Sequence, residues 1–205
     1  YLIMDEEPTL VDTVYPPFAG EFMDNVRALI DPAKLKYIVV NHVEIDHSGA
    51  LPDLMAAAPQ AVILCSEKAA PSLDKYFNSS WKKQIVKTGD AVKIGKRTLA
   101  FVEAPMLHWP DSMFTYIPEE KLLLPNDAFG QHIAASARFD DEVDMAEVMQ
   151  EAKKYYDNIL LPFSPLVVKK IDEVINMGIE IDMIAPSHGI IWRKDPKGII
   201  QASLD

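Results

Sequence analysis

The sequence is poor in cysteine, in positive charge and in long apolar runs, and each shortage excludes a class of protein. Cys65 is the only cysteine, so the internal disulfide framework of a small secreted domain is excluded. Cys65 lies in the apolar run 61–65, where we expect it to fill core space rather than to act as a nucleophile. No apolar run reaches the length of a membrane span, and no basic-then-apolar leader precedes the first strand.

Basic residues number 20 against 31 acidic ones, which gives a formal net charge of −11. This balance argues against binding to nucleic acid or to an anionic membrane, because both need a cationic surface. The rest of the composition is ordinary, with 205 residues, 49% hydrophobic and 25% charged. Such a chain can bury a full core as one domain, and we expect a soluble, cytoplasmic protein.

Short apolar runs alternate with amphipathic segments along the chain. Strands are predicted at 1–4, 9–14, 37–41 and 61–65, and helices at about 17–31, directly after residue 49, and near 67–77. A meander of strands is predicted at 84–87, 91–94, 97–103, 113–117 and 122–124. Two helices at about 144–159 and 165–177 and a last strand at 181–185 complete the pattern. Because each half mixes strands and helices, we expect an α/β fold with two sheets face to face and helices outside, an αββα four-layer sandwich.

Four potential metal ligands are packed into the hexapeptide His42-Val-Glu44-Ile-Asp46-His47, directly after a predicted strand. In extended backbone alternate side chains share a face, so His42, Glu44 and Asp46 are expected to converge. His47 breaks this alternation and needs a turn of the chain, or a second metal, to join them. Two imidazoles and two carboxylates are costly to bury without a cation. The alternative is a solvated polar cap on the strand.

Three further candidates stand in matching places, each just after a predicted strand: His108, Asp127 and His188. The carboxyl ends of strands in α/β sheets gather functional side chains on one rim. The weaker candidates are His132, a neighbour of the ligands or a surface residue, and Trp109, a pocket or core residue. Tyr155 fits helix packing alone, and the run 140–142 is interpreted as a solvated face or as the approach to a helix.

The pattern H-x-E-x-D-H, followed by a distant His, an Asp and a final His, resembles the flavodiiron proteins, also called A-type flavoproteins. These belong to the metallo-β-lactamase superfamily, whose usual motif has His where Glu44 stands. The flanking segments Met106–Tyr116, Asn126–His132 and Ser187–Arg193 look most like those of rubredoxin:oxygen oxidoreductases of sulfate-reducing bacteria. The resemblance spans nearly the whole chain and implies a metallo-β-lactamase-like diiron domain over residues 1–205.

The resemblance implies a ligand set for two iron ions. Iron one would be held by His42, Glu44 and His108, iron two by Asp46, His47 and His188, with Asp127 bridging both. A carboxylate in place of an imidazole makes the site harder and more anionic, which favours iron over zinc.

The resemblance also implies an activity, the reduction of O₂ to water, of NO to N₂O, or of both. Electrons would come through FMN from rubredoxin, in a head-to-tail homodimer. The sequence shows no Ser/Thr-rich phosphate-binding loop, and both of its ends look cut. We therefore expect a flavodoxin-like FMN domain after Asp205.

Two other functions remain open at this point. A dinuclear zinc hydrolase of the same fold would use a metal-bound hydroxide against a β-lactam, thioester or phosphodiester. A structural metal-binding module is the non-catalytic alternative, although seven ligands for two metals leave coordination positions open. Glu44 is the discriminating residue, because the hydrolases normally have His there.

Overall fold

The apolar runs of the first half form a five-stranded sheet in the order β1-β2-β3-β4-β5. The computed structural model describes residues 1–204 and divides into two units, the first of which is Tyr1–Glu103. The strands of this sheet are β1 (Leu2–Ile3), β2 (Thr9–Val11), β3 (Tyr37–Val40), β4 (Val62–Cys65) and β5 (Lys83–Ile85). Only β1 and β2 pair antiparallel; the other neighbours are parallel. The central strands are buried, as expected of Val- and Ile-rich parallel strands.

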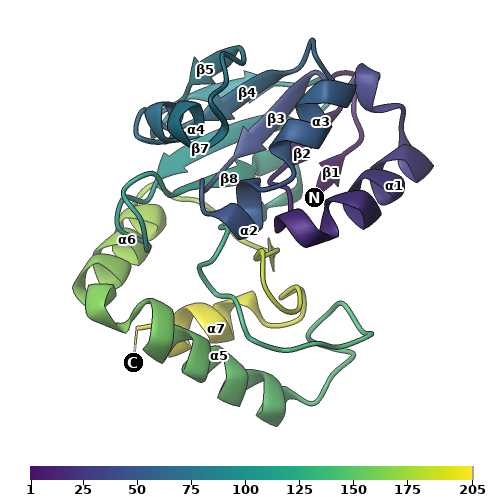
Figure 1. The fold of residues 1–205 in the computed structure, drawn as a ribbon. Helices are drawn as coiled ribbons and strands as arrows, with labels where there is room; N and C mark the ends of the chain where they lie inside the picture. Colours follow the sequence, from purple (N-terminus) through teal and green to yellow (C-terminus); the bar gives the residue numbers. More distant parts are fainter. Residues whose placement is uncertain (205) are drawn as a thin grey trace. The chain divides into compact units, whose positions relative to one another are not determined.

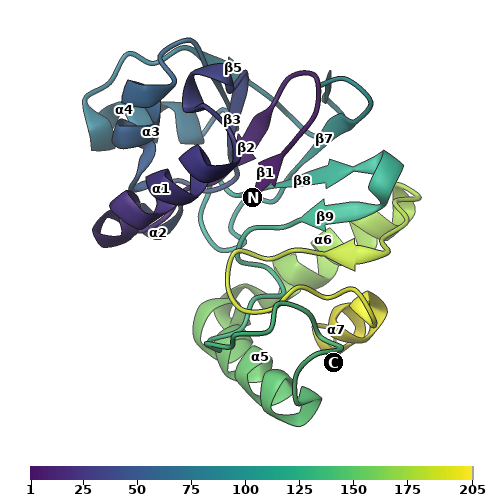
Figure 2. The same cartoon turned by 90° about the vertical axis from the view of Figure 1, so that its right-hand side faces the viewer.

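Helices connect the parallel strands of this unit, because a parallel pair requires a crossover. They are α1 (Ala19–Leu29), α3 (Leu51–Ala57) and α4 (Ala69–Phe77), and they gather on one face of the sheet (Figure 2). The short helix α2 (Ile45–Ser48) follows β3 (Figure 1). An antiparallel pair, β6 (Ala91–Lys93) and β7 (Thr98–Glu103), completes the unit.

The second unit begins at Ala104 and contains three strands and three α-helices among the described residues. β8 (Met113–Ile117) pairs antiparallel with β9 (Leu122–Leu124), and β10 (Met183–Ile184) pairs parallel with β9. The helices are α5 (Met145–Ile159), α6 (Ser164–Asn176) and α7 (Pro196–Ala202). Apolar side chains of β8, β9, α6 and α7 line a hollow of about 600 Å³ within this unit.

Most predicted elements are present, with ends that differ by a few residues. The exception in topology is β5, predicted at 84–87 as part of the meander. It lies at Lys83–Ile85 instead and joins the first sheet as a parallel strand beside β4. The helices α2 and α7 were not predicted from the sequence. Within the described residues, no helix is both long and apolar enough to cross a membrane.

Candidate metal centre

The hexapeptide 42–47 begins just after the end of a strand and runs into a short helix. β3 ends at Val40, and the Asn41 N–H donates to Asp12 Oδ1 at 2.8 Å. Glu44, with φ −55° and ψ 148°, is the residue before α2. The expectation of extended backbone through Asp46 is therefore wrong, because helical hydrogen bonding starts at Glu44, whose carbonyl accepts from His47 N–H at 2.9 Å. This helix supplies the turn of the chain that His47 needs.

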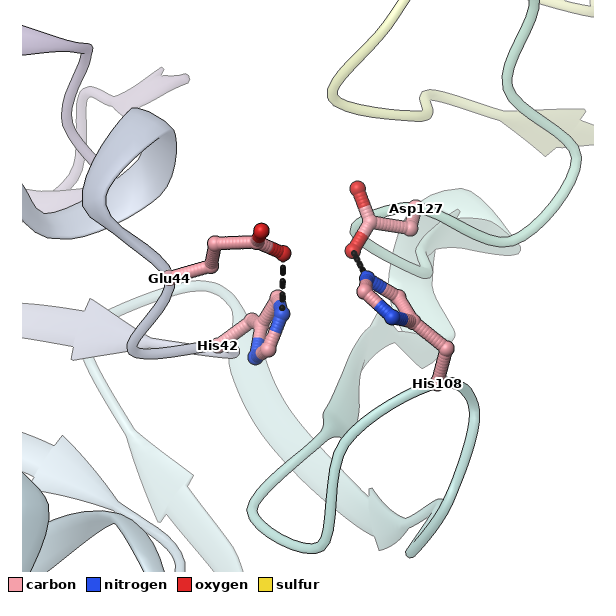
Figure 3. Close-up of side chains that lie close together, drawn as sticks. All are labelled: His42, Glu44, His108 and Asp127. Atoms are coloured by element: carbon pink, nitrogen blue, oxygen red, sulfur yellow. Dashed lines mark hydrogen bonds and ion pairs between the residues drawn. The ribbon is translucent and has the colours of Figure 1, made fainter. Parts of the chain in front are cut away.

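Two imidazole–carboxylate pairs result in the first unit. His42 Nε2 lies 3.2 Å from Glu44 Oε2 (Figure 3), and His47 Nε2 lies 3.2 Å from Asp46 Oδ2. The two imidazole rings have centroids 5.5 Å apart. Both histidines are buried, whereas each carboxylate side chain is 35% exposed. The neutral ring nitrogens and carboxylate oxygens of these pairs are donors that divalent transition metals accept.

Thr13 fixes the position of the helical half of the hexapeptide. Its backbone N–H and its hydroxyl both donate to the His47 carbonyl, at 2.7 and 2.8 Å. The Ser48 hydroxyl donates to the Val43 carbonyl at 2.7 Å and bridges back across the turn. These contacts hold His47 by its backbone, while its ring nitrogen Nε2 faces Asp46 Oδ2.

The second unit brings Asp127 together with two histidines. Asp127 Oδ2 lies 3.4 Å from His108 Nε2 (Figure 3), and Asp127 Oδ1 lies 3.2 Å from His188 Nε2. The carboxylate is only 2% exposed, so its charge needs a compensating cation or hydrogen bonds. One oxygen toward each imidazole is the arrangement that a carboxylate shared by two metal ions would have. Each of these residues follows a strand, as the sequence predicts: Asp127 follows β9 and His188 follows β10.

Tyr155 is a site residue that the sequence analysis missed. Its hydroxyl donates to Asp127 Oδ1 at 3.1 Å, and its ring centroid lies 5.8 Å from that of His188. Tyr155 shares the buried face of α5 with Val148 and Ala152. The signal was available: a tyrosine at the end of an apolar helical stripe carries a hydroxyl that must find a partner when buried.

The two weaker candidates lie beside site residues. The exposed His132 packs its ring edge-on against Tyr155, with centroids 4.7 Å apart. Its link to Asp127 therefore runs through Tyr155, which donates to that carboxylate. Trp109 packs edge-on against His108, with centroids 6.1 Å apart. The run 140–142 does lead into α5, and Asp141 and Glu142 are exposed, as expected. Asp140 is buried instead, because its carboxylate accepts the backbone N–H groups of Arg193, Lys194 and Asp195.

Each unit, taken by itself, presents imidazole and carboxylate donors of the kind that divalent metal ions bind. Four imidazoles and three carboxylates stand in contact as imidazole–carboxylate pairs, and each pair supplies one neutral and one anionic ligand. Histidine and carboxylate donors after strand ends of an α/β fold are typical of a metallo-β-lactamase-like domain.

Comparisons with solved structures confirm this fold class. Rubredoxin oxygen:oxidoreductase from Desulfovibrio gigas matches 100% of the chain with a TM-score of 0.97 and 39% sequence identity, over 52% of its own length. A flavodiiron protein from Giardia intestinalis matches 100% of the chain with a TM-score of 0.94 and 42% identity, over 50% of its length. The predicted resemblance to flavodiiron proteins is thereby confirmed.

Residues 1–189 match the model of the ODP family beta lactamase, and the chain belongs to this family. A nitric oxide reductase from Moorella thermoacetica is 58% identical over 98% of the chain and 51% of the relative. An anaerobic nitric oxide reductase flavorubredoxin from Salmonella arizonae is 47% identical over 100% of the chain and 43% of the relative. The chain thus spans about half the length of the relatives that it matches.

Proposed function

We propose that the chain is the diiron half of a flavodiiron reductase, an oxidoreductase that reduces NO to N₂O, O₂ to water, or both. Relatives that match the chain from end to end are named nitric oxide reductase and rubredoxin oxygen:oxidoreductase. The observation that carries the proposal is the pairing of Glu44 with His42, a carboxylate where the zinc hydrolases of this superfamily have an imidazole.

The resemblance to flavodiiron proteins divides the proposed ligands between two ions. It assigns His42, Glu44, His108 and Asp127 to one ion, and Asp46, His47 and His188 to the other. We propose that Asp127 also reaches the second ion, since its Oδ1 lies beside His188 Nε2. When bound, the iron pair supplies electrons and open coordination positions for a diatomic gas.

The protein's own residues set the charge and orientation of this centre. Three carboxylates offset most of the charge of two Fe²⁺ ions, which lowers the cost of holding them beside buried imidazoles. The imidazoles must be neutral to ligate, so iron binding and protonation compete at these histidines. The Tyr155 hydroxyl keeps its proton in the bond to Asp127 Oδ1 and thereby restrains the rotation of that carboxylate.

The electron supply belongs to the part of the protein beyond this chain. We propose that an FMN domain follows residue 205, that rubredoxin or a rubredoxin-like module reduces it, and that the protein works in the cytoplasm. Two of the relatives support the FMN domain and the rubredoxin donor, because their names include flavorubredoxin and rubredoxin, and their chains are about twice as long. A head-to-tail homodimer is part of the same proposal, since it would bring the FMN of one subunit to the iron pair of its partner.

Metal analysis followed by gas consumption tests the function. The protein, loaded anaerobically with Fe²⁺ and reduced, is mixed with NO and with O₂ in separate stopped-flow experiments. We expect two bound irons per chain and rapid oxidation by at least one of the gases. Two zinc ions per chain, together with hydrolysis of a thioester or β-lactam, would overturn the proposal.

A further inference from the structure

A buried amide, that of Gln131, joins the two loops that carry Asp127 and His188. Gln131 is 1% exposed. Its Oε1 accepts the Ile190 N–H at 2.7 Å, and its Nε2 donates to the Phe129 carbonyl at 2.8 Å. Its backbone N–H donates to the His188 carbonyl at 3.2 Å. The side chain of Gln131 therefore contacts Phe129, two positions after Asp127, and Ile190, two positions after His188.

Further contacts between these loops flank the two ligands on either side. Beside the amide, Trp192 Nε1 donates to the same Phe129 carbonyl at 2.9 Å. The Ser187 N–H donates to the Asn126 carbonyl at 2.8 Å, and Asn126 Nδ2 donates to Ser187 Oγ at 3.2 Å. Asp127 and His188 are thus enclosed between an Asn126–Ser187 pair and the Gln131 amide. Because each loop is held on both sides, the spacing of the two ligands is set by these hydrogen bonds.

The local backbone shows that the loops depend on such support. Asn126 and Phe129 have φ of 56° and 66°, a left-handed conformation that costs free energy for residues other than glycine. Gly189 has φ of +83°, and any Cβ there would overlap the Gln131 side-chain oxygen. The glycine next to His188 therefore leaves room for the amide.

We propose that Gln131 is a positioning residue, which holds His188 at coordinating distance from the metal ion that it shares with Asp127. The inference rests on the proposed function only in taking these two side chains as ligands. Metal–ligand distances tolerate deviations of about 0.2 Å, and hydrogen bonds around ligands typically contribute about 10–100-fold to metal affinity. Loss of the amide would leave the buried Ile190 N–H without its acceptor, whereas the Phe129 carbonyl would keep the bond from Trp192 Nε1. The segment that carries His188 would then rearrange to satisfy the Ile190 N–H.

The test compares Gln131→Leu and Gln131→Glu in the full-length protein with Gln150→Glu, a control on the exposed face of α5. Leucine fills the same space without either hydrogen bond, whereas glutamate keeps the acceptor for Ile190 and loses the donor to Phe129. Fe²⁺ affinity is measured anaerobically by competition with a chelator, and Mössbauer spectroscopy follows the two irons separately. We expect Gln131→Leu to weaken one iron about 10–100-fold, Gln131→Glu to weaken it less, and the control to match the wild type.

The inference is overturned if Gln131→Leu binds both irons with wild-type affinity, even if its melting temperature falls, because the residue would then only stabilise the fold. If that variant does not fold, Gly189→Ala displaces the same amide from the other side. It should produce the same selective loss of one iron, and unchanged affinity for both would again contradict the inference. A wild-type protein that does not bind two irons would instead contradict the proposed function.

Discussion

The carboxylate of Glu44 lies between burial and solvent, with 35% of the side chain exposed and Oε2 at 3.2 Å from His42 Nε2. A pair with one partly exposed partner is expected to contribute little to folding stability. We therefore propose that Glu44 acts in metal binding, where a single anionic donor changes which ion a site prefers. At the scale of single residues, the carboxylates proposed as iron ligands differ from those that stabilise the fold.

Glu44→Ala should lower the iron content without unfolding the protein. We expect a fall from about two irons per chain to about one, because metal binding to a site depends on its full set of deprotonated ligands. Inductively coupled plasma mass spectrometry gives the iron content, and circular dichroism verifies the fold. Glu21→Ala, on the exposed face of α1, is the control and should keep the wild-type content. Two irons and full gas consumption in Glu44→Ala would contradict the assignment.

Asp5 shows the opposite use of a carboxylate. The backbone N–H of Lys96, which donates to Oδ1 at 3.0 Å, holds the pKa of Asp5 down at about 2, helped by the N–H groups of Glu6 and Arg97. Since the folded pKa lies below the ordinary carboxyl pKa of 3.8, Asp5 stabilises the fold above about pH 4. This contribution is lost as the pH falls from about 4 through 2.

Asp5→Asn should therefore reduce the free energy of unfolding at pH 7, and the difference from the wild type should shrink between about pH 4 and pH 2. Urea denaturation at several pH values measures this. Asp24→Asn, which changes an exposed carboxylate paired only within α1, serves as the control. A difference that stays constant from pH 7 to pH 2 would show that the charge of Asp5 does not act through these hydrogen bonds.

At the scale of elements, the sequence predicted the positions of the strands better than it predicted which strands pair with one another. The strand at 122–124 was predicted to the residue, because its apolar run is bounded by clear turn signals. β5 was assigned to the wrong sheet, since the pairing of a short, exposed strand is not encoded in its own pattern. α2 was missed because four residues of helix, most of them ligands, show no apolar periodicity.

The residues that we propose as ligands could be selected from the sequence, whereas the residues that contact them could not. Histidines and carboxylates that directly follow a predicted strand are candidate ligands because of their residue type and their position. Tyr155 and Gln131 act through hydrogen bonds to residues 28 and 59 positions away, which only the folded chain brings together. The burial of Asp140 was not predicted for the same reason, because its partners at 193–195 lie more than 50 residues further along the chain.

Asp140 anchors the loop before α5 to the segment that leads into α7. Its carboxylate accepts three backbone N–H groups, from Arg193, Lys194 and Asp195, at 2.9–3.1 Å. Asp140→Ala should lower the free energy of unfolding by roughly 2–4 kcal/mol, since it removes the buried acceptor of three part-buried hydrogen bonds. The adjacent Asp141→Ala removes only an exposed pair with Arg193 and should cost less than about 1 kcal/mol. Equal effects of the two variants in urea denaturation would contradict the anchoring role.

At the scale of the whole molecule, the chain covers about half of the length of each relative that it matches. Two ferrous ions can give up two electrons, which suffice to join two molecules of NO, whereas O₂ needs four to become water. A steady reductase therefore needs a second electron store, and the proposed FMN domain is the candidate for it.

The chain 1–205 is loaded with iron, chemically reduced and mixed with NO and reduced rubredoxin. We expect it to consume NO in a single burst and then to stop, although reduced rubredoxin is still present. The full-length protein under the same conditions should continue. An NO electrode records both traces, and FMN-depleted full-length protein is the control that should behave like the short chain. Sustained consumption by residues 1–205 with rubredoxin alone would refute the need for the flavin half.

The turn from strand to helix inside the hexapeptide limits how the motif can be transplanted. A designer who copies His42–His47 onto another protein copies only the ligands, because the turn is held by Thr13, which lies 34 residues earlier and grips the His47 carbonyl. The smallest portable unit is therefore the parallel pair β2–β3 together with α2, since this pair brings Thr13 beside the loop. A recipient scaffold that offers a single strand end would present the two carboxylates on one face and leave the second histidine without its turn.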